Sequence, residues 1–443
     1  MAREDLRGNP VGTTSPAALA HAETALWRIV SFFDAPLADL DAASAADPAW
    51  VLPHLMRAGF LLTLTEPALL ADARAALRAA EGLEANATGR ERAHLAALQR
   101  CAAGDWARAC AAWDALLRDH PRDLLALQWA HLFDFYRGDA PALRDRPARA
   151  RPAWSRDDPL APYVLGMHAF GLEECHGYAE AEAVGREAVA GAAKVPWATH
   201  AVAHVMEMQG RHDEGIAWLQ ARRADWSDGN GFAGHHWWHL ALFHLERLDT
   251  AAALALYDQH LSSANAELTL QRLDGAALLW RLRLLGADVG ARWHDVAAGW
   301  DFAPTGIGHS AFNDVHSMLV LLGTGRLAEA RAWLASAHSQ AEAWQAANAA
   351  MARRIGVPLM EGLLALEEGD AARAVAWIAP VRSEAHRFGG SHAQRDLIEQ
   401  TLLAAAADAG DRGLTAHLLD ERRRRKPHTP LTAWWQRRSG VPG

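Results

Sequence analysis

The sequence predicts an all-α protein in which successive antiparallel helix pairs stack into an α-solenoid. Three observations support this. Turn glycines recur about every 34 to 44 residues along the 443-residue chain. Small and large apolar residues recur at matching positions after these turns, and period-two strand patterns and Asn-Gly hairpin turns are almost absent. Because a single helix pair cannot bury its apolar face, we expect the pairs to form roughly one superhelical turn.

The best-defined repeat follows a tight glycine turn. It contains, in order, Gly104-Asp105-Trp106, Ala109, Trp113, Leu117 and Pro121. The small residue allows the two helices to cross closely, the large ones fill the gap to the next pair, and the proline ends the helix. This order is typical of tetratricopeptide-type helix pairs.

The remaining elements follow from the same signals. One pair is expected at residues 48–82, and further pairs at the turns Gly138-Asp139, Gly177-Tyr178, Gly210-Arg211, Leu248-Asp249, Gly286, Gly325-Arg326, Gly369-Asp370 and Gly410-Asp411. Loops are expected at 147–159, 225–234 and 301–308, where proline or glycine is frequent. Residues 1–20 are expected to be loosely ordered, and residues 21–443 to form a single α-solenoid domain of about nine or ten helix pairs.

Composition narrows the class of protein. The net charge of −9 argues against a nucleic-acid partner, because phosphate neutralisation requires basic side chains. No apolar stretch is long enough to span a bilayer, and no signal peptide is recognisable. The three cysteines lack paired spacing, which fits a reducing compartment. We therefore expect a cytoplasmic protein without a membrane partner, and a homodimer is compatible with the sequence.

One basic run, Arg422-Arg423-Arg424-Arg425-Lys426, ends the segment that we take as the last helix. Positive charge at this position suits the helix dipole. We interpret the run as a helix end rather than as a nucleic-acid or targeting signal.

Two short segments carry the chemistry that the sequence suggests. His200 and His204 are four residues apart and share a helix face with Glu207, while His235 and His239 repeat the spacing one pair later. Counting back from the turn glycines places both segments on the first helices of their pairs, which line the concave groove. Since neighbouring helices pack at about 8–10 Å, the two segments are expected to meet.

Imidazoles and a carboxylate in one cluster can move protons or bind a metal. We predict a catalytic set of His200, His204, Glu207, His235 and His239, and a metal set of His200, His204, Glu207 and His239 if a metal is present. Zinc, iron and manganese suit these donors, and His235 could complete the shell. The sequence contains no nucleophile elbow, phosphate loop, dinucleotide fingerprint or His-Glu-x-x-His motif.

Other first-helix residues are candidates for binding a small-molecule ligand in the groove. They are Trp237, Trp238, Trp280, Asn313, Asp314, His316 and His168. His131 and Asp134 lie further upstream on another first helix, whereas Asp258 and His260 lie on a second helix and are expected to brace the packing between pairs. Isolated histidines are more often structural than functional, and we interpret the following in that way: His94, His212, His244, His338, His386, His392, His417 and His428.

From Arg90 to about Leu322 the order of motifs resembles the tetratricopeptide repeat protein 38 family. The matching segments are Arg92-Ala-His94 with Gly104-Asp105-Trp106, Asp123-Leu-Leu-Ala126 with Ala130-His131, Gly166-Met167 with Phe170 to Glu174, Trp197 to Met208, His235 with Trp238-His239, Tyr257 to His260, and Phe312 to His316. The resemblance implies an α-solenoid and a shared polar set that includes Asp314 and His316. It brings no catalytic assignment. His236 departs from the pattern, since asparagine is more usual there, so we do not expect it to be a required ligand.

Two functions from different classes remain open at this point. The first is a hydrolase or lyase that acts on a small organic molecule in an enclosed groove, with Glu207 and a histidine as acid and base or with metal-activated water. The alternative is a non-catalytic adaptor that binds a peptide or protein in the groove, because the fold does not determine the function. A third reading is a histidine network that only holds the solenoid closed.

Overall fold

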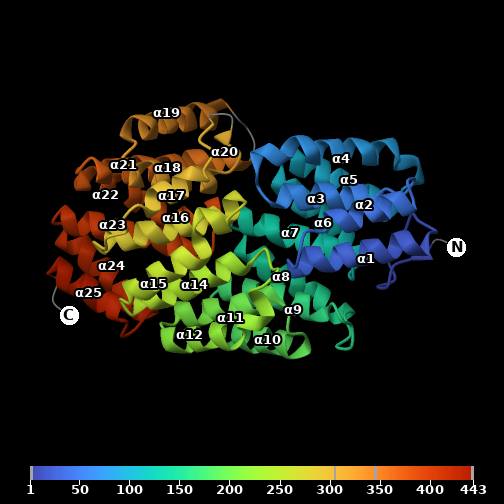
Figure 1. Cartoon of the computed structure of the whole chain (residues 1–443), viewed down its shortest axis with the longest axis horizontal. Coiled ribbons are helices and arrows are strands. Elements are labelled where there is room, and N and C mark those ends of the chain that lie inside the picture. Colours follow the sequence, from blue (N-terminus) through green and yellow to red (C-terminus); the bar gives the residue numbers. More distant parts are fainter. Residues whose placement is uncertain (1–2, 304–305, 344–346, 441–443) are drawn as a thin grey trace. The chain divides into compact units, whose positions relative to one another are not determined.

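The computed structural model describes residues 3–303, 306–343 and 347–440 and confirms that the chain is all-α. Helices follow one another along the described chain, and consecutive helices pack together (Figure 1). The described strands are β1 (Arg3–Glu4) and β2 (Pro10–Val11), which form one short antiparallel pair. In the described residues, no helix is both long enough and apolar enough to cross a membrane.

The chain divides into two compact units. The first contains the residues up to Val202 together with Ala224–Phe232, and the second contains Ala203–Arg223 together with the residues from Ala233 onward. The division falls within helix α11 (Pro196–Met208). A single solenoid domain over 21–443 stays a prediction.

The first unit consists of helices that pack in sequence order. They are α1 (Pro16–Ser31), α2 (Leu37–Ala46), α3 (Leu52–Thr63), α4 (Leu70–Gly82), α5 (Gly89–Ala102), α6 (Trp106–Asp119), α7 (Leu124–Tyr136), α8 (Ala140–Ala150), α9 (Ala161–Glu174), α10 (Tyr178–Gly191) and the first part of α11, with short 3-10 turns η1 (Pro67–Leu69), η2 (Glu84–Asn86) and η3 (Arg151–Ala153). The short helix α13 (Arg223–Trp226) starts at the boundary between the units. The expected loop 147–159 is shorter than predicted, because α8 continues through Pro147 to Ala150.

The N-terminal segment departs from the loose attachment that we expected. Residues 3–11 form the hairpin of β1 and β2, and the side chains of Asp5, Arg7 and Asn9 between the strands are buried. Asp5 accepts hydrogen bonds from the backbone N–H groups of Arg7 and Asn9, both at 2.9 Å. Arg7 also forms an ion pair with Glu23 of α1 at 2.7 Å. These polar contacts fix a segment whose composition contains no helix or strand pattern.

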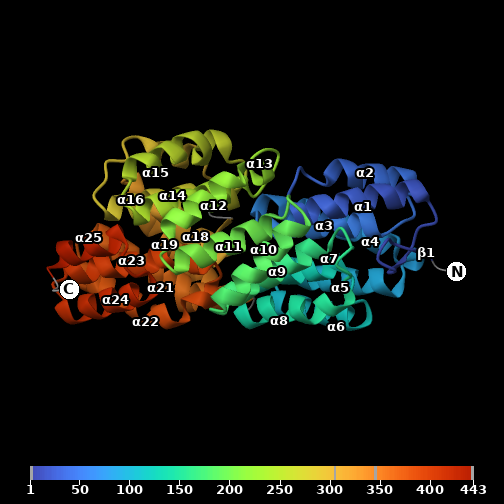
Figure 2. The ribbon, with the colours of Figure 1, turned by 90° about the horizontal axis from the view of Figure 1, so that it is seen from below.

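The second unit contains the remaining helices. They are α12 (His212–Ala221), α14 (Ala233–Glu246), α15 (Thr250–Leu256), α16 (Thr269–Leu284), α17 (Arg292–Ala298), α18 (Ala311–Gly323), α19 (Leu327–Ala343), α20 (Ala347–Met351), α21 (Val357–Glu367), α22 (Ala371–Val381), α23 (His392–Asp408), α24 (Arg412–Arg425) and α25 (Pro430–Ser439), with short segments of other helix types at η4 (Tyr257–Leu261), η5 (Ser263–Asn265), η7 (Ala352–Gly356) and η8 (Arg382–Phe388). Figure 2 shows α21 to α25 together at the red end of the colour scale. Helix α25 follows the basic run, so the helix that carries this run is not the last one.

The second unit closes on itself, because its C-terminal helices pack against its first ones. Helix α23 packs on α16, and α25 packs on α14 (Figure 1). The buried indole of Trp280 donates a hydrogen bond to Thr401 Oγ1 at 3.0 Å, which joins α16 to α23. Residues far apart in the sequence therefore share one interior.

The turns between helices have a repeated local structure. A residue with positive φ ends one helix, and an aspartate that follows it caps the next by accepting a hydrogen bond from a backbone N–H three residues on. The pattern occurs at Gly104-Asp105, Gly138-Asp139, Leu248-Asp249, Gly369-Asp370 and Gly410-Asp411. These are the turns at which the sequence predicted a new helix pair.

Close helix packing in the first unit depends on Gly171 of α9. A Cβ atom at this position would lie 2.2 Å from the backbone carbonyl oxygen of Leu143 in α8. Because a backbone atom cannot move aside as a side chain can, any larger residue must separate the two helices.

We therefore expect Gly171→Ala to lower the free energy of unfolding by about 1–3 kcal/mol, measured by urea denaturation. Gly82→Ala at the end of α4 is the matched control, since no atom lies within 4 Å of the added methyl group. The control is expected to be neutral or slightly stabilising. Equal stability of the two variants would contradict the packing argument.

Candidate functional site

Three histidines of the second unit lie close together. His204 comes from α11, and His235 and His239 come from α14. Each offers a ring nitrogen, and these atoms lie within 4.8 Å of one another. The ring centroids are 4.5 Å apart for His204 and His239 and 4.8 Å apart for His235 and His239. The structure thus brings together histidines from both predicted segments.

Two of these imidazoles are each held by a buried carboxylate. His239 Nδ1 lies 3.0 Å from Glu207 Oε2, and His235 Nδ1 lies 2.8 Å from Asp274 Oδ2. An imidazole nitrogen beside a carboxylate carries the proton, so this hydrogen-bond pattern assigns the Nδ1–H tautomer to both rings. The lone pair is then on Nε2 in each ring, which is the atom that would bind a metal or accept a proton.

Glu207 lies behind His239 rather than among the grouped donor atoms. Its Oε2 contacts His239, and its Oε1 lies 3.5 Å from Lys426 Nζ. The sequence proposed Glu207 as a catalytic residue and metal ligand. Within the described residues, the group of side chains that could share an ion with His239 does not contain it.

Asp274 is a site residue that the sequence reasoning missed. It lies on α16, it is buried, and it contacts His235 from 39 positions further along the chain. A signal was present, because Asp274 is the only acidic residue within Thr269–Leu284. A single carboxylate in a helix of mostly apolar residues needs a partner when it is buried.

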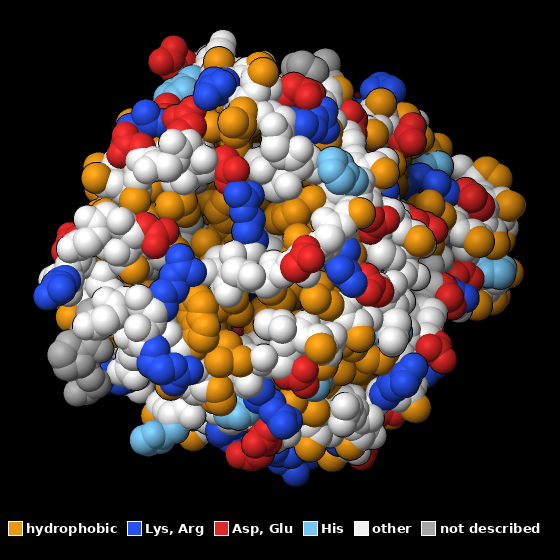
Figure 3. Space-filling model, turned by 60° about the vertical axis from the view of Figure 1, so that its left-hand side comes forward, with side chains coloured by type: hydrophobic (Ala, Val, Ile, Leu, Met, Phe, Trp, Pro, Cys, Tyr) orange, Lys and Arg blue, Asp and Glu red, His pale blue; other side chains and the backbone are white. Residues whose placement is uncertain are grey.

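The basic run at 422–426 is more than a solvated helix end. Arg422 and Lys426 are buried, whereas Arg423 is half-buried and Arg424 and Arg425 are exposed, and these three pair with acidic side chains of the same helix. On the face shown in Figure 3, Lys and Arg side chains are interspersed with Asp and Glu. The run does end a helix as predicted, because α24 ends at Arg425 and Lys426 is its C-cap residue, but Arg422 and Lys426 are also buried.

These two cations continue the polar network behind the histidines. Lys426 Nζ lies 3.0 Å from Glu246 Oε1, and Arg422 Nη2 lies 2.6 Å from the same oxygen. Arg422 Nη1 also contacts Asp396 Oδ1 at 3.2 Å. Burial opposes charge on Lys426, but Glu246 and Asp396 outweigh it and raise the pKa of Lys426 above its usual value.

His239, which is fully buried, is held neutral. Burial lowers the pKa of His239 well below its usual range, and the neighbouring His235 and His236 add to the effect. A neutral imidazole is the form that binds metals and accepts protons. His236 itself is buried on α14, but among the described residues it is not a member of the histidine group.

The tryptophans beside the histidines have different surroundings. The Trp238 ring stacks on His235 with centroids 5.1 Å apart, so it forms a wall of the site. Trp237 stacks on His260 of η4 at 3.8 Å, and Asp258 pairs with Arg292 at 2.7 Å, which fits the expectation that η4 braces the packing between pairs. Trp280 is directed toward Thr401 by its hydrogen bond.

The candidates on α18 form their own contacts. Asp314 Oδ2 accepts a hydrogen bond from the backbone N–H of Gly308 at 3.1 Å, and His316 Nδ1 lies 2.8 Å from the carbonyl oxygen of Phe312. Asn313 is half-buried in the first turn of the helix. Among the described residues, none of the three is grouped with the histidine cluster, so a role in ligand binding stays a prediction.

Two predicted site residues belong to the first unit. His200 lies one turn before His204 on α11, where its ring contacts Phe170, Trp197 and Phe232 at centroid distances of 5.2, 5.9 and 5.0 Å. His168 is buried on α9, where burial and then Arg151 lower its pKa. His200 thus has aromatic neighbours, whereas charged groups of both signs act on His168, namely Arg151 and Arg144 against Glu180 and Asp145.

Other polar residues of the first unit are structural. His94 Nε2 contacts Asp123 Oδ2 at 2.8 Å, and Arg90 Nε contacts the same oxygen at 2.5 Å, which agrees with a structural reading of His94. His131 is fully buried between Phe170 and Trp197, and burial lowers its pKa to about 3.

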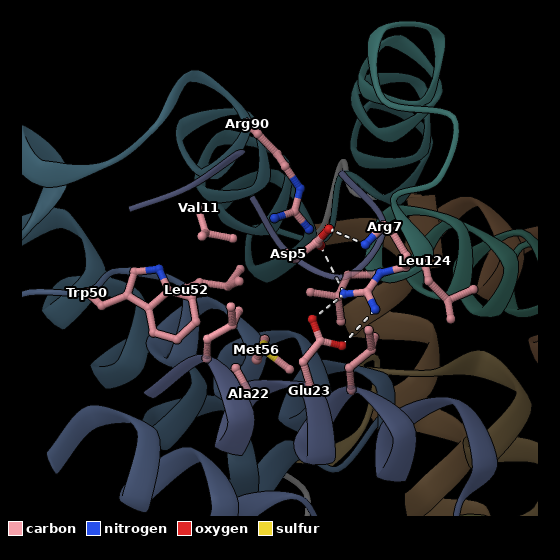
Figure 4. Close-up of a pocket in the computed structure, with 13 residues that line it drawn as sticks. Asp5, Arg7, Val11, Ala22, Glu23, Trp50, Leu52, Met56, Arg90 and Leu124 are labelled. Carbon is pink, nitrogen blue, oxygen red and sulfur yellow. Dashed lines mark hydrogen bonds and ion pairs between the residues drawn. The ribbon is translucent and has the colours of Figure 1, made fainter. Parts of the chain in front are cut away.

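A separate pocket lies under the N-terminal hairpin of the first unit. Figure 4 shows apolar side chains from α1, α3 and α7 at its wall and the ion pairs of Arg7 with Asp5 and Glu23 at its polar side. The pocket contains none of the predicted site residues.

A comparison of the chain with protein-family models finds no model that matches. The resemblance to the tetratricopeptide repeat protein 38 family therefore stays a prediction.

Asp314 on α18 makes the folding stability depend measurably on pH. Burial raises the pKa of this carboxyl to about 7, although the Gly308 N–H opposes the shift. Between about pH 4 and pH 7 the unfolded chain loses this proton while the folded chain keeps it, so folding stability falls as the pH rises. The loss is complete above pH 7.

We expect Asp314→Asn to remove this loss of folding stability with rising pH, because asparagine has no proton to release. Relative to the unmodified protein, the variant should gain about 1–3 kcal/mol of unfolding free energy between pH 5 and pH 8, measured by urea denaturation at each pH. Glu267→Gln, which changes an exposed carboxylate, is the control and should follow the unmodified protein. A constant offset for Asp314→Asn at every pH would show that this proton is not retained on folding.

Proposed function

We propose that the second unit binds a divalent transition metal through His204, His235 and His239. The metal would serve a hydrolase or lyase reaction on a small organic molecule. The observation that carries the proposal is the pair of buried carboxylates on Nδ1 of His239 and His235. Metal-binding histidines typically donate their second N–H to a carboxylate, which sets the tautomer and the ring orientation.

The three imidazole donors restrict which metal ion the site can bind. Three neutral imidazoles are the protein ligands of many catalytic zinc sites, in which further positions remain for water or substrate. Manganese prefers oxygen donors, so zinc or iron suits this cluster better. His200 belongs to the first unit, and the proposed ligand set does not require it.

The second unit supplies the surroundings that such a reaction needs. A bound divalent metal would supply Lewis acidity that activates water or polarises a carbonyl group. Glu207 and Asp274 hold the imidazoles in place, and the Trp238 ring provides an apolar surface beside His235. Burial of His204 and His239 keeps bulk water away from the donor atoms.

We also propose that the helix pairs are of the tetratricopeptide type and form an α-solenoid. The repeated turn, in which a residue with positive φ precedes a capping aspartate, supports this because it occurs in both units at turns that the sequence predicted. The buried position of the histidines favours a small-molecule site over an adaptor surface, since a docked peptide contacts exposed side chains.

Metal analysis tests the proposal directly. The purified protein is expected to contain about one equivalent of zinc or iron per chain by elemental analysis. His204→Ala and His239→Ala should each reduce zinc affinity by about 100-fold or more, because each removes a ligand. His338→Ala is the control, since His338 is a half-exposed histidine that pairs with Glu361 on another surface of the unit.

Thermal unfolding gives a second measurement of the same site. A chelator should lower the melting temperature of the unmodified protein but not that of His204→Ala, because only a bound ligand stabilises the native state. If the protein binds no transition metal and His239→Ala only loses stability, the cluster is a structural network. If peptide capture persists unchanged in both variants, the adaptor function is favoured.

A further inference from the structure

Lys426 approaches the histidine cluster from the far end of the chain. It is the C-cap residue of α24, 187 positions after His239 (426 − 239), and its side chain is buried. Its backbone packs closely against Gly210, because a Cβ atom on Gly210 would lie 3.3 Å from Lys426 Cα. Gly210 lies in the turn that follows helix α11, on which His204 and Glu207 lie. The main chain at Lys426 is therefore packed against the turn that follows these two residues.

The two carboxylate oxygens of Glu207 contact different partners, Lys426 and His239. Oε1 faces the ammonium group at 3.5 Å, and Oε2 faces His239 Nδ1 at 3.0 Å. A carboxylate without the cation could rotate about its terminal torsion, which is broad for glutamate. With the cation in place, one oxygen is held on Lys426 and the other is directed at the imidazole.

Lys426 is in turn held from the opposite side. Glu246 Oε1 accepts from Lys426 Nζ at 3.0 Å and from Arg422 Nη2 at 2.6 Å. Arg422 reaches Asp396, which also accepts from Gln400 Nε2 at 2.6 Å. Three carboxylates thus surround two cations, and these contacts fix the position of the ammonium group before any ligand binds.

We infer that Lys426 is a positioning residue of the proposed metal site, which acts by holding Glu207 on His239 Nδ1. The expected effect of Lys426 on metal binding rests on the proposed function. The expected effect of Lys426 on the His239 tautomer can be measured without a metal. Among the described residues the polar contacts of Lys426 are with Glu207 and Glu246, which are not proposed ligands, so we assign it a positioning role and not a catalytic one. Its role is to select the His239 tautomer that presents Nε2 to the metal.

The first test measures the His239 tautomer in the metal-free protein by nitrogen NMR of labelled histidine, with His239→Gln used to assign the signal. The unmodified protein should show the Nδ1–H form. Lys426→Met should show a mixture of tautomers, and Lys426→Arg should restore the Nδ1–H form because it retains the cation. An unchanged Nδ1–H form in Lys426→Met would overturn the inference, whether or not the protein binds metal.

The second test measures zinc affinity by competition with a chromophoric chelator. Lys426→Met is expected to bind zinc about 10-fold or more weakly than the unmodified protein, and Lys426→Arg should recover most of the loss. Arg424→Met is the matched control, because Arg424 lies in the same basic run but is exposed and pairs only with Asp420. Lys426→Gln, which retains a hydrogen-bond donor without the charge, replaces Lys426→Met if the latter does not fold.

The outcomes separate the two proposals. Zinc binding by the unmodified protein with equal affinity in Lys426→Met overturns the inference and leaves the metal site standing. Absence of zinc binding by the unmodified protein rejects the metal site. The tautomer measurement then decides whether Lys426 orients Glu207 on His239 in the absence of a metal. A loss of affinity that Lys426→Arg fails to restore, accompanied by a lower melting temperature, would show a merely structural role.

Discussion

Charge balance inside the second unit is the constraint on which its site depends. Glu207, Glu246 and Asp396 are held beside Lys426 and Arg422, all away from bulk water. An isolated charge in such a place costs several kcal/mol, and removal of one partner leaves the other uncompensated. The network is consequently stable only when helices α11, α14, α23 and α24 are all in place. The orientation of His239 is a local result of this wider arrangement.

The helical fold could be predicted largely from the sequence because its determinants are local. A glycine with positive φ, a capping aspartate and an apolar stripe act over one or two turns of helix, as at Gly104-Asp105 and Gly369-Asp370. The N-terminal hairpin could not be predicted in this way, since its order comes from side-chain contacts such as that of Arg7 with Glu23. Closure of α23 and α25 on α16 and α14 likewise depends on packing between distant residues.

The same distinction applies to the candidate site. The spacing of His235 and His239 places both on one helix face, so local geometry was enough to find them. Asp274 and Lys426 escaped detection because their partners are 39 and 219 positions away in the chain. Spacing within a helix also suggested that Glu207 shares a ligand set with His204, whereas its oxygens are directed at His239 and Lys426. A side chain's direction depends on its partners as well as on its register.

The contact between Gly210 and the backbone of Lys426 has a consequence for biosynthesis. A ribosome adds His239 to the chain 187 residues before it adds Lys426. During that interval Glu207 and Glu246 lack the cation that they share in the finished chain, and the backbone at Lys426 is not yet packed against Gly210. The histidines are therefore without the Lys426 contact to Glu207 throughout much of translation. The site is completed only after Lys426 has left the exit tunnel.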